Sequence, residues 1–140
     1  MDREELCRLV LEVLQEEAGA PQVRSVALPT LSVRPEDRLD TGNPGDHVFT
    51  RDLFSLQESP RLGAGLMEMK KTTFDWTLSY DEIDYVIEGR LSIHCNGRVE
   101  TAGPGEVLLI PKGSRIQFSA PDYARFLYVT YPADWQNPAN

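Results

Sequence analysis

The chain has 140 residues and a formal net charge of -8 at pH 7, from 22 Asp and Glu against 14 Lys and Arg. A chain of this length buries roughly two-thirds of the surface that its unfolded form exposes, which predicts one domain with its own core. The acidity disfavours nucleic acids and anionic membranes as partners, because both are bound by clustered Lys and Arg.

Residues 2–17 carry the first predicted element, an amphipathic helix. Asp2 is placed to cap the helix, and Gly19 with Pro21 to end it. Apolar side chains recur three and four positions apart, at Leu6, Leu9, Val10, Val13 and Leu14. We expect this stripe to pack on a barrel of the same or a neighbouring chain, or else to dock on a partner protein.

The start of the chain has acidic residues where a signal peptide is basic, and no run reaches the apolar length of a membrane span. A cytoplasmic protein is therefore expected. We divide the chain into an N-terminal helix over residues 1–20 and one β-rich domain over residues 21–140.

Short β-rich segments follow the helix. The ten Pro and ten Gly all lie beyond residue 18 and divide the sequence into pieces of strand length, as in a sandwich or barrel. Asn96-Gly97 predicts a two-residue hairpin, and residues 34–45 read as an irregular loop. The predicted strands are residues 22–28, 47–56, 64–70, 81–88, 90–95, 98–102, 106–110, 116–119 and 124–131.

Two spaced motifs resemble the conserved boxes of the cupin superfamily. In the first box Glu82 precedes Gly89 by seven positions. In the second, Gly105 is followed six positions later by Pro111-x-Gly113. Such glycines and prolines form tight turns between the strands of a double-sheet jelly roll. The resemblance implies an all-β fold, a cupin (RmlC-like) jelly-roll barrel with one N-terminal α-helix.

The chain departs from that pattern at the metal ligands. Metal-dependent cupins have two His shortly before the Glu and a third three residues after Pro-x-Gly. Here no His precedes Glu82, and Ile116 stands at the third position; His47 and His94 lie elsewhere. Transition metals favour imidazole and need several ligands, so we predict no transition-metal site of the cupin His type.

A closer resemblance, to the cupin domain of the ethanolamine-utilisation Q family, covers residues 76–84, 86–89, 110–114, 125–129 and 132–136. This resemblance implies a cytoplasmic protein of bacterial microcompartments. It also implies either an acetate kinase activity, which links acetyl phosphate and ADP with acetate and ATP, or a role in compartment assembly. Cupins commonly pair their sheets edge to edge, so a homodimer is expected.

The candidate site follows from strand alternation. If Glu82 points into the barrel, Asp84 and Val86 do so too, whereas Ile83 and Tyr85 face away. Buried carboxylates are costly unless they are paired, protonated or bound to a cation. We expect Glu82 and Asp84 to be catalytic and to hold Mg²⁺, or else to be satisfied by backbone amides, Tyr hydroxyls or an Arg. The predicted substrate-binding residues are Trp76, Tyr80, Lys70 and Tyr128.

The residues alone support a kinase weakly, because there is no Gly-rich phosphate loop ending in Gly-Lys-Ser or Gly-Lys-Thr. Lys70 and Lys71 could reach the barrel mouth, or could form an exposed pair at a strand end. Three functions stay open at this point. They are a kinase that uses Mg²⁺ and ATP, a non-catalytic adaptor that binds microcompartment shell or cargo proteins, and a sensor of a small-molecule ligand.

Overall fold

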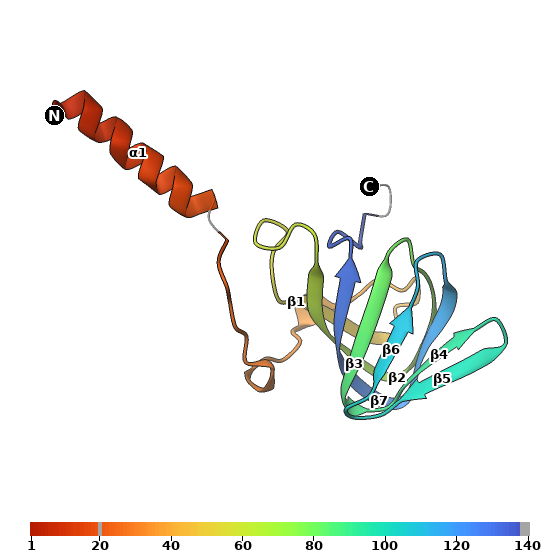
Figure 1. Ribbon diagram of the computed structural model, residues 1–140. Coiled ribbons are helices and arrows are strands. Elements are labelled where there is room, and N and C mark those ends of the chain that lie inside the picture. Colours follow the sequence, from red (N-terminus) through yellow and green to blue (C-terminus); the bar gives the residue numbers. More distant parts are fainter. Residues whose placement is uncertain (20, 138–140) are drawn as a thin grey trace. The chain divides into compact units, whose positions relative to one another are not determined.

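Figure 1 shows the computed structural model, which describes residues 1–19 and 21–137. The chain divides into two compact units, Met1–Thr30 and Leu31–Asn140. The predicted boundary at Ala20 lies outside the described residues. The elements are α1 (Arg3–Gly19), the 3₁₀ turns η1 (Leu28–Thr30) and η2 (Pro35–Asp37), β1 (His47–Asp52), β2 (Gly63–Thr77), β3 (Asp81–Gly89), β4 (Leu91–Cys95), β5 (Arg98–Ala102), β6 (Val107–Ile110) and β7 (Arg115–Tyr131).

The first unit consists of α1 and the segment that follows it. Asp2 caps the helix as predicted, since its carboxylate accepts a hydrogen bond of 2.8 Å from the backbone N–H of Glu5. The predicted strand at residues 22–28 is wrong, because this segment pairs with no strand and ends in η1. The residues of the apolar stripe are exposed, namely Leu6, Leu9, Val10, Val13 and Leu14. No helix in the described part of the chain is long and apolar enough to span a membrane.

The second unit is an antiparallel β-barrel of two layers, as predicted (Figure 1). One sheet has the strand order β1-β2-β7-β3-β6, and β4 pairs with both β5 and β7. The Asn96-Gly97 hairpin joins β4 to β5 with Cys95 paired to Arg98, which confirms that prediction. The buried apolar side chains of both layers form one core cluster.

Strands β2 and β7 are much longer than predicted, and they pair with each other along their whole length. The first half of β7 also pairs with β4 and the second half with β3, so one strand belongs to both layers. Lys70 and Lys71 do not end a strand, because β2 continues past them. The register of β2 shifts between Lys70 and Thr72, and Lys71 takes a left-handed backbone conformation there (φ 44°). Such a bulge bends a strand without ending it.

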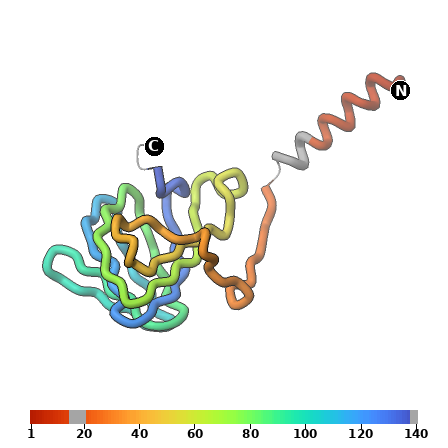
Figure 2. The backbone as a smooth tube through the Cα atoms, turned by 180° about the vertical axis from the view of Figure 1, so that it is seen from behind, coloured from red at the N-terminus to blue at the C-terminus, as the bar shows by residue number. Residues whose placement is uncertain are grey.

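The irregular segment before β1 runs alongside that edge strand. Figure 2 traces it from behind, and its backbone bridges β1 where Arg38 pairs with Phe49. The N–H of Leu39 donates to the carbonyl of Val48 at 2.9 Å, which holds Leu39 against the core. After β7 the chain turns back, and Trp135 is buried in the same core. Leu39 and Trp135, one from each segment, both line the cavity at the candidate site.

Candidate functional site

The two predicted acidic residues both point into the barrel. Along β3 buried and exposed side chains alternate; Glu82 is 6% exposed and Asp84 is fully buried. Ile83 and Tyr85 are 45% and 42% exposed on the outer face. The register shift of β3 lies beyond Val86, so it leaves the alternation at the acidic pair unbroken. The predicted orientation of both carboxylates is confirmed.

The neighbours of the acidic pair leave three of its four oxygens without a hydrogen-bond donor from outside the pair. On β7, Thr130 lies opposite Glu82 and Tyr128 lies opposite Asp84. Within residues 1–19 and 21–137, no group outside the pair hydrogen-bonds to Glu82 Oε2, to either oxygen of Asp84, or to Thr130 Oγ1, although all four atoms are buried. The alternative in which amides or an Arg satisfy these oxygens is therefore not observed for these atoms. The two carboxyl groups interact with each other through a hydrogen bond, which requires a proton on one of them.

Burial decides the ionisation of the pair. It raises the pKa of Glu82 to about 7. It also raises the pKa of Asp84 well above the usual value, and the negative charge of Glu82 raises that pKa further. The two carboxyl groups therefore hold at least one proton at neutral pH unless a cation replaces it.

A small cavity of about 10 Å³ lies beside Glu82. This volume admits one water-sized group. Trp76 Nε1 donates a hydrogen bond of 2.7 Å to the hydroxyl of Tyr80, and the Trp135 ring centroid lies 6.2 Å from that of Trp76. The lining residues are Leu39, Thr50, Met67, Phe74, Trp76, Tyr80, Glu82, Phe118, Tyr128 and Trp135.

An outer cleft of about 740 Å³ lies against this cavity. Five residues line both spaces, namely Leu39, Thr50, Trp76, Tyr80 and Trp135. One layer of side chains therefore separates the buried carboxylate from the outer cleft. The other lining residues are Glu36, Asp37, Arg38, Asp40, Asp75, Thr77, Ser79 and Gln136. Arg38 directs its guanidinium to the carbonyls of Pro44 and Asp46. Two of the four carboxylates of the cleft, those of Glu36 and Asp37, form ion pairs with Arg34 at 3.2 and 2.9 Å.

Tyr128 shapes the cavity from the β7 side. Its ring crosses over Gly65 and its hydroxyl donates a hydrogen bond of 2.8 Å to Asp52 Oδ1 on β1. A Cβ atom at Gly65 would lie 2.0 Å from this ring, so only glycine leaves room for it. Burial raises the pKa of both Tyr80 and Tyr128, so their hydroxyl groups stay protonated.

The structure brings together most of the predicted site residues. Trp76, Tyr80 and Tyr128 line the cavity with Glu82, while Asp84 lies one step further inside and does not line it. Lys70 lies outside the cavity and the outer cleft, and its Nζ is 6.0 Å from the ring centroid of Tyr123.

Sequence reasoning assigned no role to Trp135 or Thr130. Trp135 lies within residues 132–136, which carried part of the family resemblance, and this resemblance could have identified it as a site residue. The position of Thr130 opposite Glu82 depends on the pairing of β3 with β7, and no local pattern reveals that pairing.

The unpartnered oxygens fit a hard cation better than a transition metal. Carboxylate and hydroxyl oxygens are the ligands that Mg²⁺ prefers. Glu82 and Asp84 would hold such an ion, with Thr130 Oγ1 as a neutral neighbour. Across the described ranges, no group of three or more His, Cys, Asp and Glu is arranged to hold a metal.

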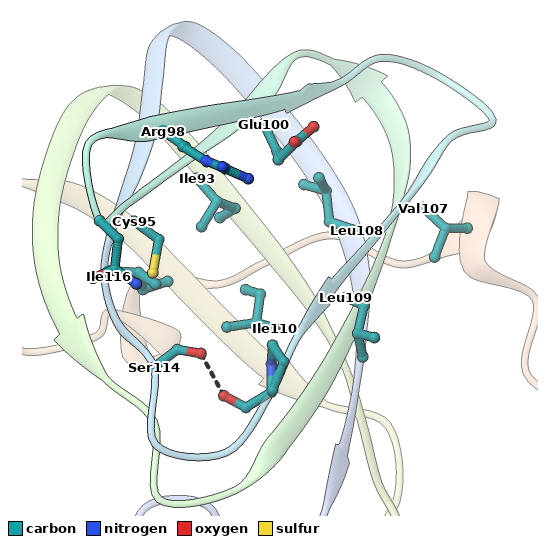
Figure 3. A pocket seen from close by; sticks show the side chains of 12 residues that line it. Ile93, Cys95, Arg98, Glu100, Val107, Leu108, Leu109, Ile110, Ser114 and Ile116 are labelled. Carbon is teal, nitrogen blue, oxygen red and sulfur yellow. Dashed lines mark hydrogen bonds between the residues drawn. The ribbon is translucent and has the colours of Figure 1, made fainter.

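A second cleft, of about 700 Å³, opens between the β4–β5 hairpin and β6 (Figure 3). Its floor includes Ile93, Ile110 and Ile116, and Arg98 and Glu100 reach in from β5. Ile110 is the cross-strand neighbour of Glu82, so this cleft lies beside the acidic pair. Ile116 occupies the position of the third cupin histidine, and it gives this cleft an apolar wall in place of an imidazole ligand.

Curated relatives share the sequence of the barrel. A model of the family "Ethanolamine utilisation protein EutQ" matches residues 1–137. "Acetate kinase EutQ" of Clostridioides difficile is 68% identical over 113 residues, which are 81% of this chain and 72% of that protein. "Acetate kinase EutQ" of Salmonella typhimurium is 46% identical over 90 residues, which are 64% of this chain. The match spans 39% of the length of the Salmonella protein.

Solved structures agree with this relationship. The structure of the Clostridium difficile EutQ protein has a TM-score of 0.79 with 68% identity, over 81% of this chain and 82% of that one. An RmlC-like cupin from Shewanella frigidimarina has a TM-score of 0.61 with 14% identity, over 82% of this chain and 96% of that one, and shows the fold alone. The predicted cupin jelly roll is confirmed. Because the family model covers nearly the whole chain, this protein belongs to the ethanolamine utilisation protein EutQ family.

Proposed function

We propose that this protein is a Mg²⁺-dependent acetate kinase of ethanolamine utilisation, with Glu82 and Asp84 at its centre. In the reaction, the bond between the γ-phosphorus of ATP and ADP breaks, and a bond from that phosphorus to an acetate oxygen forms. Two curated relatives named acetate kinase support the activity. The observation that supports the place of the reaction is the buried carboxylate pair, in which three of the four oxygens receive no hydrogen bond from any described group outside the pair.

The charge of the outer cleft explains why the kinase reaction needs a cation. Four acidic residues line the outer cleft; Glu36 and Asp37 are ion-paired with Arg34, whereas Asp40 and Asp75 accept hydrogen bonds from neutral groups and keep their charge. A polyphosphate would be repelled there unless its charge were neutralised, and bound Mg²⁺ supplies that neutralisation in phosphoryl transfer. Glu82 and Asp84 bind the cation in exchange for their shared proton. Trp76, Tyr80 and Trp135 exclude water from the carboxylates.

The experiment supplies purified protein with ATP, Mg²⁺ and acetate and measures acetyl phosphate. Glu82→Gln and Asp84→Asn are expected to lower the rate at least about 100-fold, as the loss of a group that positions transition-state charge does. Glu88→Gln is the matched control, because Glu88 lies on the same strand and is exposed. An inactive wild-type protein, or full activity in both site variants, would show that the carboxylate-centred kinase is wrong.

A separate observation favours a second function, that of an adaptor inside a microcompartment. Within the unit Met1–Thr30, the apolar stripe of α1 is exposed along the helix. Such a stripe fits an apolar groove of a shell or cargo protein.

The predicted homodimer stays a prediction. The surface that suits it is the exposed apolar face of β3 and β6, formed by Ile83, Tyr85, Val107 and Leu109.

The adaptor function predicts the result of removing the helix. Deletion of residues 1–18 is expected to abolish co-purification with a shell or cargo protein, while circular dichroism shows an intact barrel. Val10→Asp in the stripe should have the same effect, and Glu12→Gln outside the stripe should have none. Co-purification that survives both the deletion and Val10→Asp would exclude α1 as the docking element.

A further inference from the structure

We propose that the cavity beside Glu82 and the outer cleft together bind a short primary ammonium ion. The ammonium head would occupy the cavity against the carboxylate of Glu82, and the carbon chain would lie in the outer cleft. This inference does not rest on the kinase activity, because it follows from the size, lining and charge of the two spaces.

The cavity has the size and lining that an ammonium head requires. Its volume of about 10 Å³ matches one water-sized group, and an ammonium head is of similar size. Six of its ten lining residues are aromatic. The negative faces of aromatic rings attract cations, and aromatic cages are a recurrent means of binding ammonium ligands. The six are Phe74, Trp76, Tyr80, Phe118, Tyr128 and Trp135.

No cationic side chain faces the carboxylate of the cavity. Of the ten described residues that line it, Glu82 is the only charged one. Glu82 shares a proton with the buried Asp84, and no other group in residues 1–19 and 21–137 donates a hydrogen bond to Glu82 Oε2. A buried carboxylate needs a partner of opposite charge or a hydrogen-bond donor. An alkylammonium head supplies both, since it carries a positive charge and three N–H donors.

The outer cleft suits the remainder of such a ligand. It shares five lining residues with the cavity, so the two spaces adjoin across these side chains. Asp40 and Asp75, which accept hydrogen bonds from neutral groups, attract a cation toward the cleft, whereas Glu36 and Asp37 are ion-paired with Arg34. Thr77 and Ser79 offer hydroxyl groups for a polar end of the chain.

The same geometry sets the selectivity. An alcohol of equal size lacks the positive charge that would pair with Glu82. Tetramethylammonium is too bulky for a cavity that admits one water-sized group. Mg²⁺ needs several oxygen ligands, which Glu82, Asp84 and Thr130 offer, whereas most of the wall of the cavity itself is carbon and suits an ammonium head. Mg²⁺ on Glu82 and Asp84 and an ammonium head beside Glu82 would compete for one carboxylate.

The chain contains its own reporter, because both of its two tryptophans, Trp76 and Trp135, line the cavity. Titration of the full chain with ethylammonium chloride, without ATP or Mg²⁺ and near neutral pH, is expected to change the tryptophan fluorescence in a saturable way. Ethanolammonium should act likewise. Ethanol, sodium chloride and tetramethylammonium chloride at equal concentrations should not. Equal responses to ethylammonium and to ethanol or sodium chloride would overturn the inference.

Variants locate the binding. Glu82→Gln keeps the shape of the side chain and removes its charge, so it should lower the affinity for ethylammonium at least about 10-fold. Glu88→Gln should leave that affinity unchanged. Phe74→Leu removes one ring and keeps both reporters, and it should weaken binding about 3-fold or more. Unchanged affinity in either Glu82→Gln or Phe74→Leu would overturn the inference. A failed kinase assay would leave these results intact, so the two ideas fail separately.

Discussion

Asp84→Asn is expected to stabilise the protein above neutral pH and to have little effect in acid. The pKa of Asp84 is raised in the folded state by burial and by the charge of Glu82. Below the unfolded value near 3.8 the carboxyl is protonated in both states, so its ionisation costs no stability. As the pH rises, the unfolded state loses its proton first, and the free energy of unfolding falls until the folded pKa is passed.

Glu82 sets the scale of this effect. Its pKa rises from 4.5 to about 7, which corresponds to about 3 kcal/mol of stability lost between these values. Asn at position 84 cannot ionise, and its amide can donate to the unpartnered Glu82 carboxylate. The gain from the substitution should therefore be largest in mildly alkaline solution.

Urea unfolding at several pH values, with a chelator present to remove divalent cations, measures this difference. Asp122→Asn is the control, because Asp122 is exposed, and its stability curve should run parallel to that of the wild type. If the stability curve of Asp84→Asn also runs parallel to that of the wild type, ionisation of the buried pair does not lower the free energy of unfolding as the geometry requires.

Gly89→Ala is expected to destabilise the barrel by at least about 3 kcal/mol. Gly89 has a left-handed backbone with φ of 75°, and a Cβ atom there would lie 2.0 Å from the carbonyl oxygen of Tyr123. That oxygen already accepts a hydrogen bond of 3.0 Å from the N–H of Arg90, so it cannot move without breaking the bond. The glycine of the first sequence motif therefore serves the close approach of β3 to β7.

Gly113→Ala provides a matched comparison. Gly113 also has a left-handed backbone, with φ of 90°, but a Cβ atom there meets no other atom within 4 Å. The stability lost on Gly113→Ala should be limited to the cost of the left-handed backbone conformation for alanine, about 1–2 kcal/mol. Urea denaturation of both variants separates the two effects. Equal losses would mean that the contact with Tyr123 contributes nothing beyond the strained backbone.

Local patterns predicted the features that local chemistry controls. The cap at Asp2, the hairpin at Asn96-Gly97 and the inward turn of Glu82 and Asp84 each depend on a few neighbouring residues. Alternation in β3 is reliable because one face is buried against the core, where a slip by one residue would expose every apolar side chain.

Features that depend on distant partners could not be read in this way. The lysine pair at residues 70 and 71 looked like a strand end, but β7 lies alongside β2 on both sides of the bulge and keeps it extended. The isolated β-rich segment at residues 22–28 finds no partner and forms no strand. Trp135 reaches the site only because the chain folds back after β7.

The hydrogen bond from Tyr128 to Asp52 has a consequence for the edge of the sheet. Strand β1 ends the sheet, and apart from the bridge at Arg38 its outer backbone groups can pair with another chain. Tyr128 reaches over β2 and fastens the last residue of that edge from inside the barrel. One side chain therefore both holds the end of the edge strand and walls the cavity, so a change at Tyr128 disturbs the edge of the sheet together with the cavity.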